Sequence, residues 1–257
     1  MIGVFDSGAG GVTAVKELRR LLPTADIAFF PDRKNAPYGT RSQRELLPLV
    51  RRDIEILLSH GAELVLMACC TASTVYPMLE DRLRRVAIPI IEPTARAAAE
   101  AASGGRVAVI ATEATVRSHA FKDALSARGI RDVLEIAARD LVAAVECGER
   151  DGSLSDTGEA LLNRYLKEVI SYGADTLILG CTHFPHLEGE IGKRLPRVKI
   201  ISSSREGAKE TLKSLRSQGS GRTVYIGQRK TVEKERKRIW ENTEEAGSTT
   251  PLPRSLR

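Results

Sequence analysis

Two cysteines in matching surroundings are the first candidates for chemistry in this chain of 257 residues. Residues 63–73 and 175–185 each run from a strand-like apolar stretch through a small residue to a cysteine, a threonine and a predicted helix. This internal echo indicates two half-molecules of similar build, each delivering a cysteine, Cys69 or Cys181, at the carboxyl end of a strand. Because open α/β sheets bind ligands at that end, both thiols are candidates for one site.

Two opposed thiols fit one demanding class of reaction, the inversion of a carbon that carries a weakly acidic proton. The proton leaves one face of the carbon and a different proton arrives on the other, so two acid/base groups opposite each other are the simplest solution. A helix amino terminus beside each cysteine would favour the thiolate and lower the thiol pKa from its usual value of about 8.5.

Each thiol needs a partner that holds or exchanges its proton. His183 lies two residues after Cys181 and can titrate near neutrality, whereas Asp6, at the end of the first predicted strand, is the candidate for Cys69. A structural role is open for both partners, because Asp6 could cap the helix that begins near Gly10 and His183 could simply start a helix.

The loop from Asp6 to Gly11 is rich in glycine and joins a predicted strand to a predicted helix. It lacks the G-x-G-x-x-G spacing of a dinucleotide-binding turn. Its backbone N–H groups and the hydroxyl of Ser7 suit a carboxylate as readily as a phosphate.

Short apolar runs rich in branched residues alternate with longer amphipathic segments, which predicts parallel sheets covered by helices on both faces. The predicted strands are Ile2–Phe5, Asp26–Phe30, Glu63–Ala68, Arg106–Ile110, Val133–Ala137, Asp175–Leu179 and Val198–Ile201. The predicted helices are Val12–Leu22, Ser42–Ser59, Thr74–Arg85, Thr94–Ala102, Val116–Arg128, Thr157–Tyr172 and Arg205–Arg216. The segment Val86–Pro93, which holds two prolines, interrupts the alternation and favours two α/β domains over one.

Composition and charge exclude several classes of protein. No apolar run reaches the roughly 18 to 20 residues of a membrane span, and the first residues lack the pattern of a signal peptide, so cytoplasmic residence without a membrane partner is expected. Four irregularly placed cysteines indicate free thiols rather than a disulfide framework. Residues 228–257, with eight Lys/Arg and five Asp/Glu, contribute +3 of the net charge of +6, and aromatics make up only 4%, which argues against a nucleic-acid partner.

Five motifs resemble, in order, those of the glutamate racemases in the aspartate/glutamate racemase superfamily. They are Val4–Gly11, Pro37–Gly39, Ala68–Ser73, Leu141–Glu146 and Gly180–Pro185. The resemblance runs from Ile2 to about Gly227. It implies two similar α/β domains with the active site in the cleft between them.

The resemblance also implies how the chain divides between these domains. Residues 1–92 and about 208–257 would form the first domain, and residues 93–207 the second. Near the end of the chain, a short charged helix is expected at Thr231–Asn242 and a mobile tail at about 243–257.

Roles for individual residues follow from the same resemblance. Cys69, assisted by Asp6, resembles the thiol on the D-glutamate side, and Cys181, assisted by His183 and Glu146, resembles the thiol on the L-glutamate side. The substrate's carboxylates and ammonium group would be bound, largely through hydroxyls and backbone amides, by Ser7, Pro37, Tyr38, Gly39, Thr71, Thr115 and Thr182. No pyridoxal phosphate, other cofactor or metal is implied. D-glutamate would supply the peptidoglycan precursor of a bacterial cell wall. Since relatives vary in how they dimerise, a homodimer stays open.

One departure from the family concerns the substrate-binding residue after the first cysteine, where relatives carry asparagine and this chain carries Cys70. An amide donates and accepts strong hydrogen bonds, whereas a thiol does so weakly, so roughly 1 to 3 kcal/mol is lost if a buried partner stays unsatisfied. Weak activity, a shifted substrate choice and an altered role are all open. A milder departure is Ser202, where relatives commonly carry aspartate, and Cys147 is interpreted as structural.

Three other interpretations use the same residues. A racemase for aspartate or another acidic amino acid would share the two-thiol mechanism, although the Pro-Tyr-Gly and Cys-Thr-His motifs favour glutamate. A catalytically silent binding protein would accommodate Cys70 and the basic tail, but it would not need paired thiols. A metal site built from Cys69, Cys70, Cys181 and His183 is disfavoured, because adjacent cysteines lack the C-x₂₋₄-C spacing of structural zinc sites.

Overall fold

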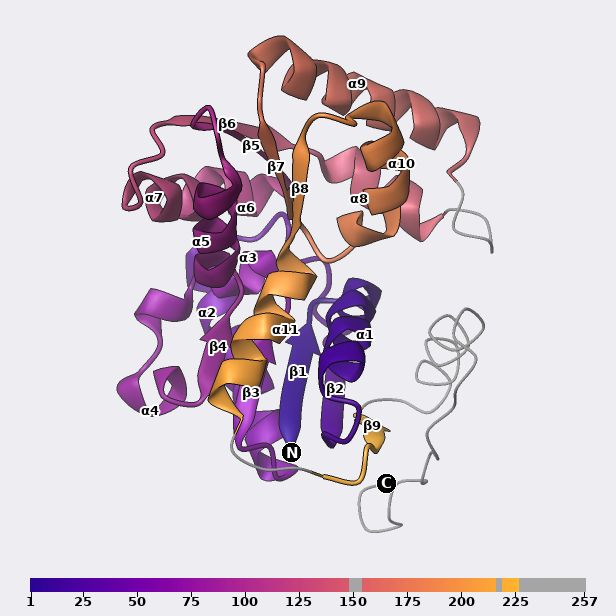
Figure 1. Ribbon diagram of the computed structural model, residues 1–257. Coiled ribbons are helices and arrows are strands. Elements are labelled where there is room, and N and C mark those ends of the chain that lie inside the picture. Colours follow the sequence, from indigo (N-terminus) through magenta and orange to yellow (C-terminus); the bar gives the residue numbers. More distant parts are fainter. Residues whose placement is uncertain (148–153, 216–218, 227–257) are drawn as a thin grey trace.

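Two parallel sheets form the framework of the chain in this computed structural model, which describes residues 1–147, 154–215 and 219–226 (Figure 1). The first sheet has the order β4-β3-β1-β2-β9, formed by Ala87–Pro89, Leu64–Met67, Ile2–Asp6, Ile27–Pro31 and Thr223–Tyr225. The second has the order β6-β5-β7-β8, formed by Asp132–Ala137, Arg106–Ala111, Thr176–Gly180 and Lys199–Ser202. Every neighbouring pair is parallel, which confirms the prediction of two α/β domains.

Side chains of the first sheet alternate between two faces that different helices cover. The covering helices are α1 (Val12–Leu21), α2 (Gln43–Ser59) and α11 (Ser203–Ser214). Phe5 on β1 packs against α2, whereas Val4, one residue earlier, packs on the opposite face with α1 and α11. All of β1 is buried, as expected for a parallel strand covered on both faces.

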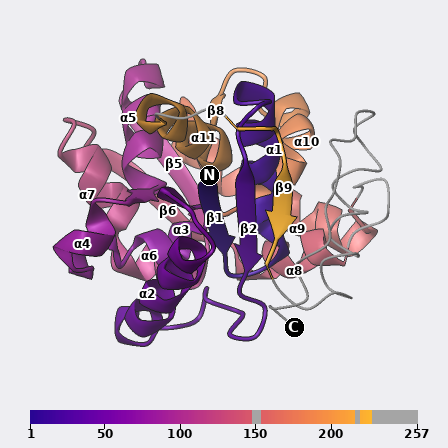
Figure 2. The ribbon, with the colours of Figure 1, turned by 90° about the horizontal axis from the view of Figure 1, so that it is seen from below.

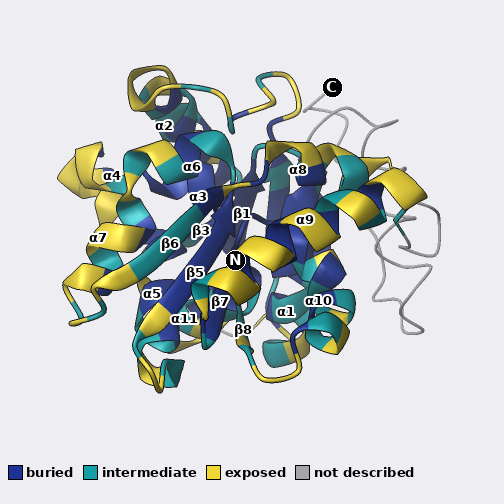
Figure 3. Ribbon diagram, turned by 90° about the horizontal axis from the view of Figure 1, so that it is seen from above, coloured by how far each residue is buried: buried dark blue, intermediate teal, exposed yellow. Residues whose placement is uncertain are grey.

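The second sheet is sandwiched in the same way. Its covering helices are α5 (Ile91–Ala101), α7 (Ala120–Ser126), α8 (Arg139–Glu146), α9 (Asp156–Tyr172) and α10 (Glu188–Arg194). Val109 on β5 packs with α5 and α7, and the next residue, Ile110, packs with α8, α9 and α10. Figure 3 shows the central strands β5 and β7 in dark blue and the outward side of α9 in yellow, which locates the core between sheet and helices.

Helix α11 links the two domains, because it follows β8 of the second sheet and packs beside α1 of the first. Figure 1 shows this helix running from the end of β8 along the first sheet. After α11 the described chain ends at β9, which pairs with β2 at the edge of the first sheet (Figure 2). The division into 1–92 with about 208–257, and 93–207, stays a prediction.

Two short strands lie where no strand is predicted. Strand β4 falls inside the segment Val86–Pro93, so this segment extends the first sheet rather than interrupting the pattern. Its last residue, Pro89, lies on an edge strand, where a residue without an N–H donor is tolerated. Strand β9 has only three residues and lies far along the chain from its partner β2.

The predicted helix Thr74–Arg85 is wrong, because the structure breaks it into short pieces. It contains only the 3₁₀ turn η2 (Tyr76–Met78) and the four-residue α4 (Asp81–Arg84). Pro77 is the fourth residue of the predicted helix, where it removes a backbone donor and crowds the preceding turn. The helical turn that matters for the site, α3 (Cys70–Ser73), precedes this segment.

The predicted helix Val116–Arg128 is likewise divided. His119 adopts the left-handed conformation with φ of 53° and separates α6 (Glu113–Ser118) from α7. The predicted helix Thr231–Asn242 and the tail at about 243–257 lie outside the described residues. None of the helices within the described ranges combines the length and apolar character that crossing a bilayer requires.

Candidate active site

A cavity of about 370 Å³ lies where the carboxyl ends of the two sheets face each other. Its walls come from the segments that follow β1, β2 and β3 of the first sheet and β5, β6 and β7 of the second. The predicted site residues on these walls are Ser7, Pro37, Tyr38, Gly39, Cys69, Cys70, Thr71, Glu146, Cys181, Thr182 and His183. The other two, Asp6 and Thr115, are buried beside the cavity and bond to its wall residues.

The walls also hold residues for which no role is predicted. They are Gly8, Ala36, Thr40, Thr112, Arg139, Val142 and Ala143. Thr112 follows β5 directly, and Arg139 lies two residues after β6. The strand-end rule that singles out the two cysteines would therefore have found both, had it been applied to every predicted strand.

Cys69 is the N-cap residue of α3 and is almost fully buried. Its Sγ accepts a hydrogen bond from the Ala72 N–H at 3.5 Å and lies 3.6 Å from the Ser7 hydroxyl. Burial, and then the charge of Asp6, raise the pKa of the thiol to about 12, although the Ala72 N–H acts in the opposite direction. The expectation of a lowered pKa is thus wrong for Cys69, because desolvation outweighs the helix terminus.

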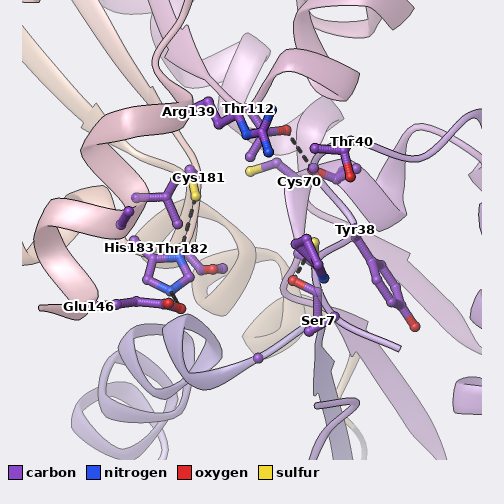
Figure 4. A pocket seen from close by; sticks show the side chains of 18 residues that line it. Ser7, Tyr38, Thr40, Cys70, Thr112, Arg139, Glu146, Cys181, Thr182 and His183 are labelled. Carbon is purple, nitrogen blue, oxygen red and sulfur yellow. Dashed lines mark hydrogen bonds and ion pairs between the residues drawn. The ribbon is translucent and has the colours of Figure 1, made fainter. Parts of the chain in front are cut away.

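Cys181 belongs to a chain of contacts that ends at a carboxylate (Figure 4). Its Sγ lies 3.6 Å from Nδ1 of His183, whose Nε2 lies 2.9 Å from Oε1 of Glu146 at the end of α8. Burial lowers the pKa of His183, but the hydrogen bonds with Cys181 and Glu146 more than compensate and raise it to about 10. This raised pKa favours an imidazolium beside the Cys181 sulfur at neutral pH.

Asp6 ends β1 and connects the two halves of the site. Its carboxylate accepts hydrogen bonds from the Gly8 N–H at 2.9 Å and from the Thr182 hydroxyl at 3.1 Å. Burial is the main cause that raises its pKa, and its charge in turn raises the pKa of both Cys69 and His183. A local structural role and an electrostatic role toward Cys69 and His183 are therefore combined in one side chain.

Three threonine hydroxyls form a closed triangle between the domains. Thr71 Oγ1 lies 2.8 Å from that of Thr112 and 3.0 Å from that of Thr115, and the latter two are 2.9 Å apart. Thr71 belongs to α3 of the first domain, whereas Thr112 and Thr115 cap and begin α6 of the second. Through this triangle Thr115 contacts the wall residues Thr71 and Thr112, although it does not itself line the cavity.

The Pro-Tyr-Gly segment approaches the second domain through its backbone. The Gly39 carbonyl accepts a hydrogen bond from the Ala114 N–H at 2.8 Å, and a Cβ on Gly39 would lie 3.0 Å from the Thr112 side chain. The Tyr38 hydroxyl points away from the cavity (Figure 4) and lies 2.6 Å from Asp32 and 2.7 Å from Asp53. Tyr38 can therefore offer a substrate its backbone but not its hydroxyl.

Cys70 lines the cavity and is almost fully buried. Burial raises the pKa of its thiol well above the usual range, while the Ser203 hydroxyl acts in the opposite direction. Cys70 therefore presents a neutral sulfur to the cavity at neutral pH. In the parts of the chain that the structure describes, no cluster of three or more His, Cys, Asp or Glu side chains is arranged to hold a metal ion.

Comparison with known proteins identifies the group to which this site belongs. The Asp/Glu/Hydantoin racemase family matches residues 16–211. The glutamate racemase of Desulforudis audaxviator is 40% identical over 203 residues, which cover 78% of this chain and 73% of the relative. That of Mycobacterium leprae is 37% identical over 218 residues, covering 83% and 78%.

Solved structures agree with these relatives. A glutamate racemase isoform from Bacillus anthracis superimposes with a TM-score of 0.83 at 30% identity, covering 100% of this chain and 98% of that one. The Francisella tularensis glutamate racemase in complex with D-glutamate gives a TM-score of 0.80 at 25% identity, covering 98% and 97%. With the two-domain fold and with cysteines from both sheets on one cavity, these matches show that the chain is a racemase of the Asp/Glu/Hydantoin racemase family, in its glutamate racemase group.

Proposed function

We propose that this chain interconverts L- and D-glutamate without a cofactor, with Cys69 and Cys181 as its two acid/base catalysts. The observation that carries the proposal is that both thiols line one cavity, each delivered by a different sheet and each held by its own polar partners. A substrate bound between the two domains meets one thiol from each of them.

In the L-to-D direction, the Cys181 thiolate removes the α-proton of L-glutamate, and the Cys69 thiol delivers its proton to the opposite face of the carbanion. One C–H bond breaks and another forms, while an S–H bond forms at Cys181 and one breaks at Cys69. The raised pKa of Cys69 keeps this thiol protonated near neutrality, which is the state that this direction requires. The D-to-L direction reverses each step.

The neighbouring groups set the protonation states that the two directions need. The His183 imidazolium, held by Glu146, stabilises the negative charge of the Cys181 thiolate. Asp6 is the proton-exchange partner of Cys69, since it lies at the end of the adjacent strand β1 and a raised pKa brings it closer to neutrality. These two partners reset the thiols between turnovers.

The cavity walls provide polar groups for an acidic amino acid. Hydroxyls of Ser7, Thr71 and Thr182 line it, Tyr38 and Gly39 offer their backbone, and Thr115 acts through its bond with Thr71. The names of the relatives and the D-glutamate complex of a neighbour with a similar fold support glutamate as the substrate. We infer that the D-glutamate formed in the cytoplasm enters the peptidoglycan precursor.

The experiment that tests this function is incubation of the purified protein with L-glutamate in deuterated water, without added cofactor. Optical rotation reports racemisation, and NMR reports exchange of the α-proton. We expect the rotation to decay to zero with uptake of α-deuterium. Cys69→Ala and Cys181→Ala should each lower the racemisation rate at least about a thousandfold, the scale of a lost acid/base group.

The matched control is Cys147→Ala, because Cys147 is exposed and outside the cavity. This variant should racemise glutamate at the rate of the parent protein. L-aspartate is assayed in parallel, and a higher kcat/KM for aspartate than for glutamate would contradict the proposed substrate. If the folded protein causes no change in rotation and no exchange of the α-proton with either amino acid, the racemase proposal is refuted.

A further inference from the structure

The charges on the cavity walls are unequally distributed. Among the described residues that line the cavity, Arg139 is the only side chain with a fixed positive charge. Glu146 supplies the one carboxylate among these described residues, and it is bonded to His183, whose charge stabilises Cys181. An acidic amino acid brings two carboxylates into this space. Arg139 is the only described wall residue whose fixed positive charge can pair with one of them.

Within the described part of the chain, no neighbouring residue accounts for a guanidinium at this position. Arg139 forms no hydrogen bond or ion pair with any other residue in the described ranges, and its side chain is exposed. It is the first residue of α8, where the positive end of the helix dipole disfavours a cation. The adjacent Asp140 lies 3.6 Å from Arg164 and thus satisfies a different arginine.

The direction of the side chain indicates which substrate group it meets. Figure 4 shows Arg139 extending into the cavity on the side of Thr112 and Cys70. The two thiols are each only 6% exposed, so the reacting α-carbon must lie deep between them. The carboxylate at the other end of the substrate then extends toward the exposed wall to which Arg139 belongs.

We propose that Arg139 binds the side-chain carboxylate of the acidic amino acid and thereby selects substrates that carry a second negative charge. A guanidinium can donate two parallel N–H bonds to a carboxylate, which fixes its orientation as well as its charge. On the same side of the cavity, Cys70 offers only a weak donor and the Thr112 hydroxyl is bonded to Thr71 and Thr115, so Arg139 is the principal polar anchor there. This inference rests on the proposed racemase function and names a specificity-determining residue for it.

The test compares Arg139→Gln and Arg139→Lys with Arg131→Gln as the matched control. Arg131 is exposed, precedes β6 at its opposite end, and loses the same charge on substitution. We expect Arg139→Gln to raise KM for both enantiomers of glutamate about tenfold, equivalent to about 1.4 kcal/mol of binding, with a smaller change in kcat. Arg139→Lys should recover part of this loss, and Arg131→Gln should match the parent protein.

Two binding titrations separate this inference from the proposed function. Glutarate, which has two carboxylates, should bind Arg139→Gln about tenfold more weakly than the parent. L-norvaline, in which a methyl group replaces the side-chain carboxylate, should bind both proteins equally. An unchanged KM, or equal glutarate affinity in parent and variant, would overturn the inference while leaving the racemase intact. Weaker norvaline binding by the variant would also overturn it, because it would assign Arg139 to the α-carboxylate.

The titrations also decide the inference if the parent protein fails to racemise glutamate. In that case the proposed function is refuted by the exchange experiment alone. If Arg139→Gln weakens glutarate binding and Arg131→Gln does not, Arg139 would still be supported as the residue that binds a carboxylate. If the parent protein does not bind glutarate, the inference about Arg139 would be overturned too.

Discussion

Gly10 and Thr182 belong to different domains and approach so closely that a Cβ on Gly10 would lie 2.4 Å from the Thr182 hydroxyl. The same Cβ would lie 2.8 Å from Nδ1 of His183. The glycine-rich loop after β1 therefore seats the Cys-Thr-His segment directly, and a hydrogen atom at this position allows the two halves of the site to meet.

Gly10→Ala is therefore expected to separate the two thiols rather than merely strain the loop. Because displacing a reacting group by about 1 Å can lower the rate of catalysis about a hundredfold, kcat should fall by about that factor. The control is Gly189→Ala, since a Cβ at Gly189 would meet nothing within 4 Å. Steady-state kinetics and a thermal melt on both variants check this, and a Gly10→Ala enzyme with parental kcat would contradict the close approach.

Cys70→Asn introduces the amide that the family resemblance leads us to expect beside Cys69, one of the two proposed catalysts. Since a hydrogen bond to a charged group contributes about 1.5 to 3 kcal/mol, we expect kcat/KM for glutamate to rise about tenfold or more. Cys70→Ala, which removes the sulfur without adding an amide, is the comparison. Equal kcat/KM in the parent, the asparagine variant and the alanine variant would show that position 70 does not contact the substrate.

Glu146→Gln tests the contact that holds the His183 imidazolium. The Glu146 carboxylate, 2.9 Å from the ring, is one of the causes that raise the pKa of His183 to about 10. Its replacement by a neutral amide should lower that pKa, so the alkaline limb of kcat/KM for L-glutamate should move to lower pH. A pH–rate profile of both proteins measures the shift, and an unmoved alkaline limb would mean that another group controls it.

Asp53 makes the stability of the first domain depend on pH. Burial is the main cause that raises its pKa to about 7, whereas an unfolded aspartate titrates near pH 3.9. Below about pH 4 the Asp53 carboxyl is protonated in both the folded and the unfolded protein. As the pH rises toward 7, it ionises only in the unfolded protein. The free energy of unfolding therefore falls by at most about 1.4 kcal/mol per pH unit. Chemical denaturation from pH 5 to 8 should show that the free energy of unfolding declines less steeply with pH in Asp53→Asn than in the parent protein. Glu55→Gln, on the exposed side of the same helix, should keep the parental slope.

The seven strands predicted from apolar runs all exist, because buried parallel strands leave a local signal that needs no knowledge of the partner strand. The three-residue strands β4 and β9 leave no such signal, since their pairing with β3 and β2 defines them. The two helix breaks also differ in whether the sequence indicates them. A proline such as Pro77 is visible in the sequence as a helix breaker, whereas the left-handed conformation of His119 depends on the packing around it.

The candidate site divides along the same line. The two cysteines, Glu146 and His183 could be placed from motifs, because each lies within or near a segment that resembles the family. The direction of the Tyr38 hydroxyl and the raised pKa of Cys69 depend on residues distant in the sequence and on burial, neither of which a motif records. Arg139 lies outside any motif; its position two residues after β6 is a signal in the sequence, but only the assembled cavity shows that its side chain lines the site.

The threonine triangle has a consequence for how ligands and domain contacts are coupled. Three hydroxyls at 2.8, 2.9 and 3.0 Å possess three protons for three contacts, so every O–H in the ring is already engaged. A carboxylate that accepts a hydrogen bond from the Thr71 hydroxyl must open one side of the ring. That side joins the two domains unless it is the bond between Thr112 and Thr115. Binding of a carboxylate and contact between the two domains thus compete for the same three hydroxyl donors. A bound acid can therefore weaken the contact that holds the domains together here.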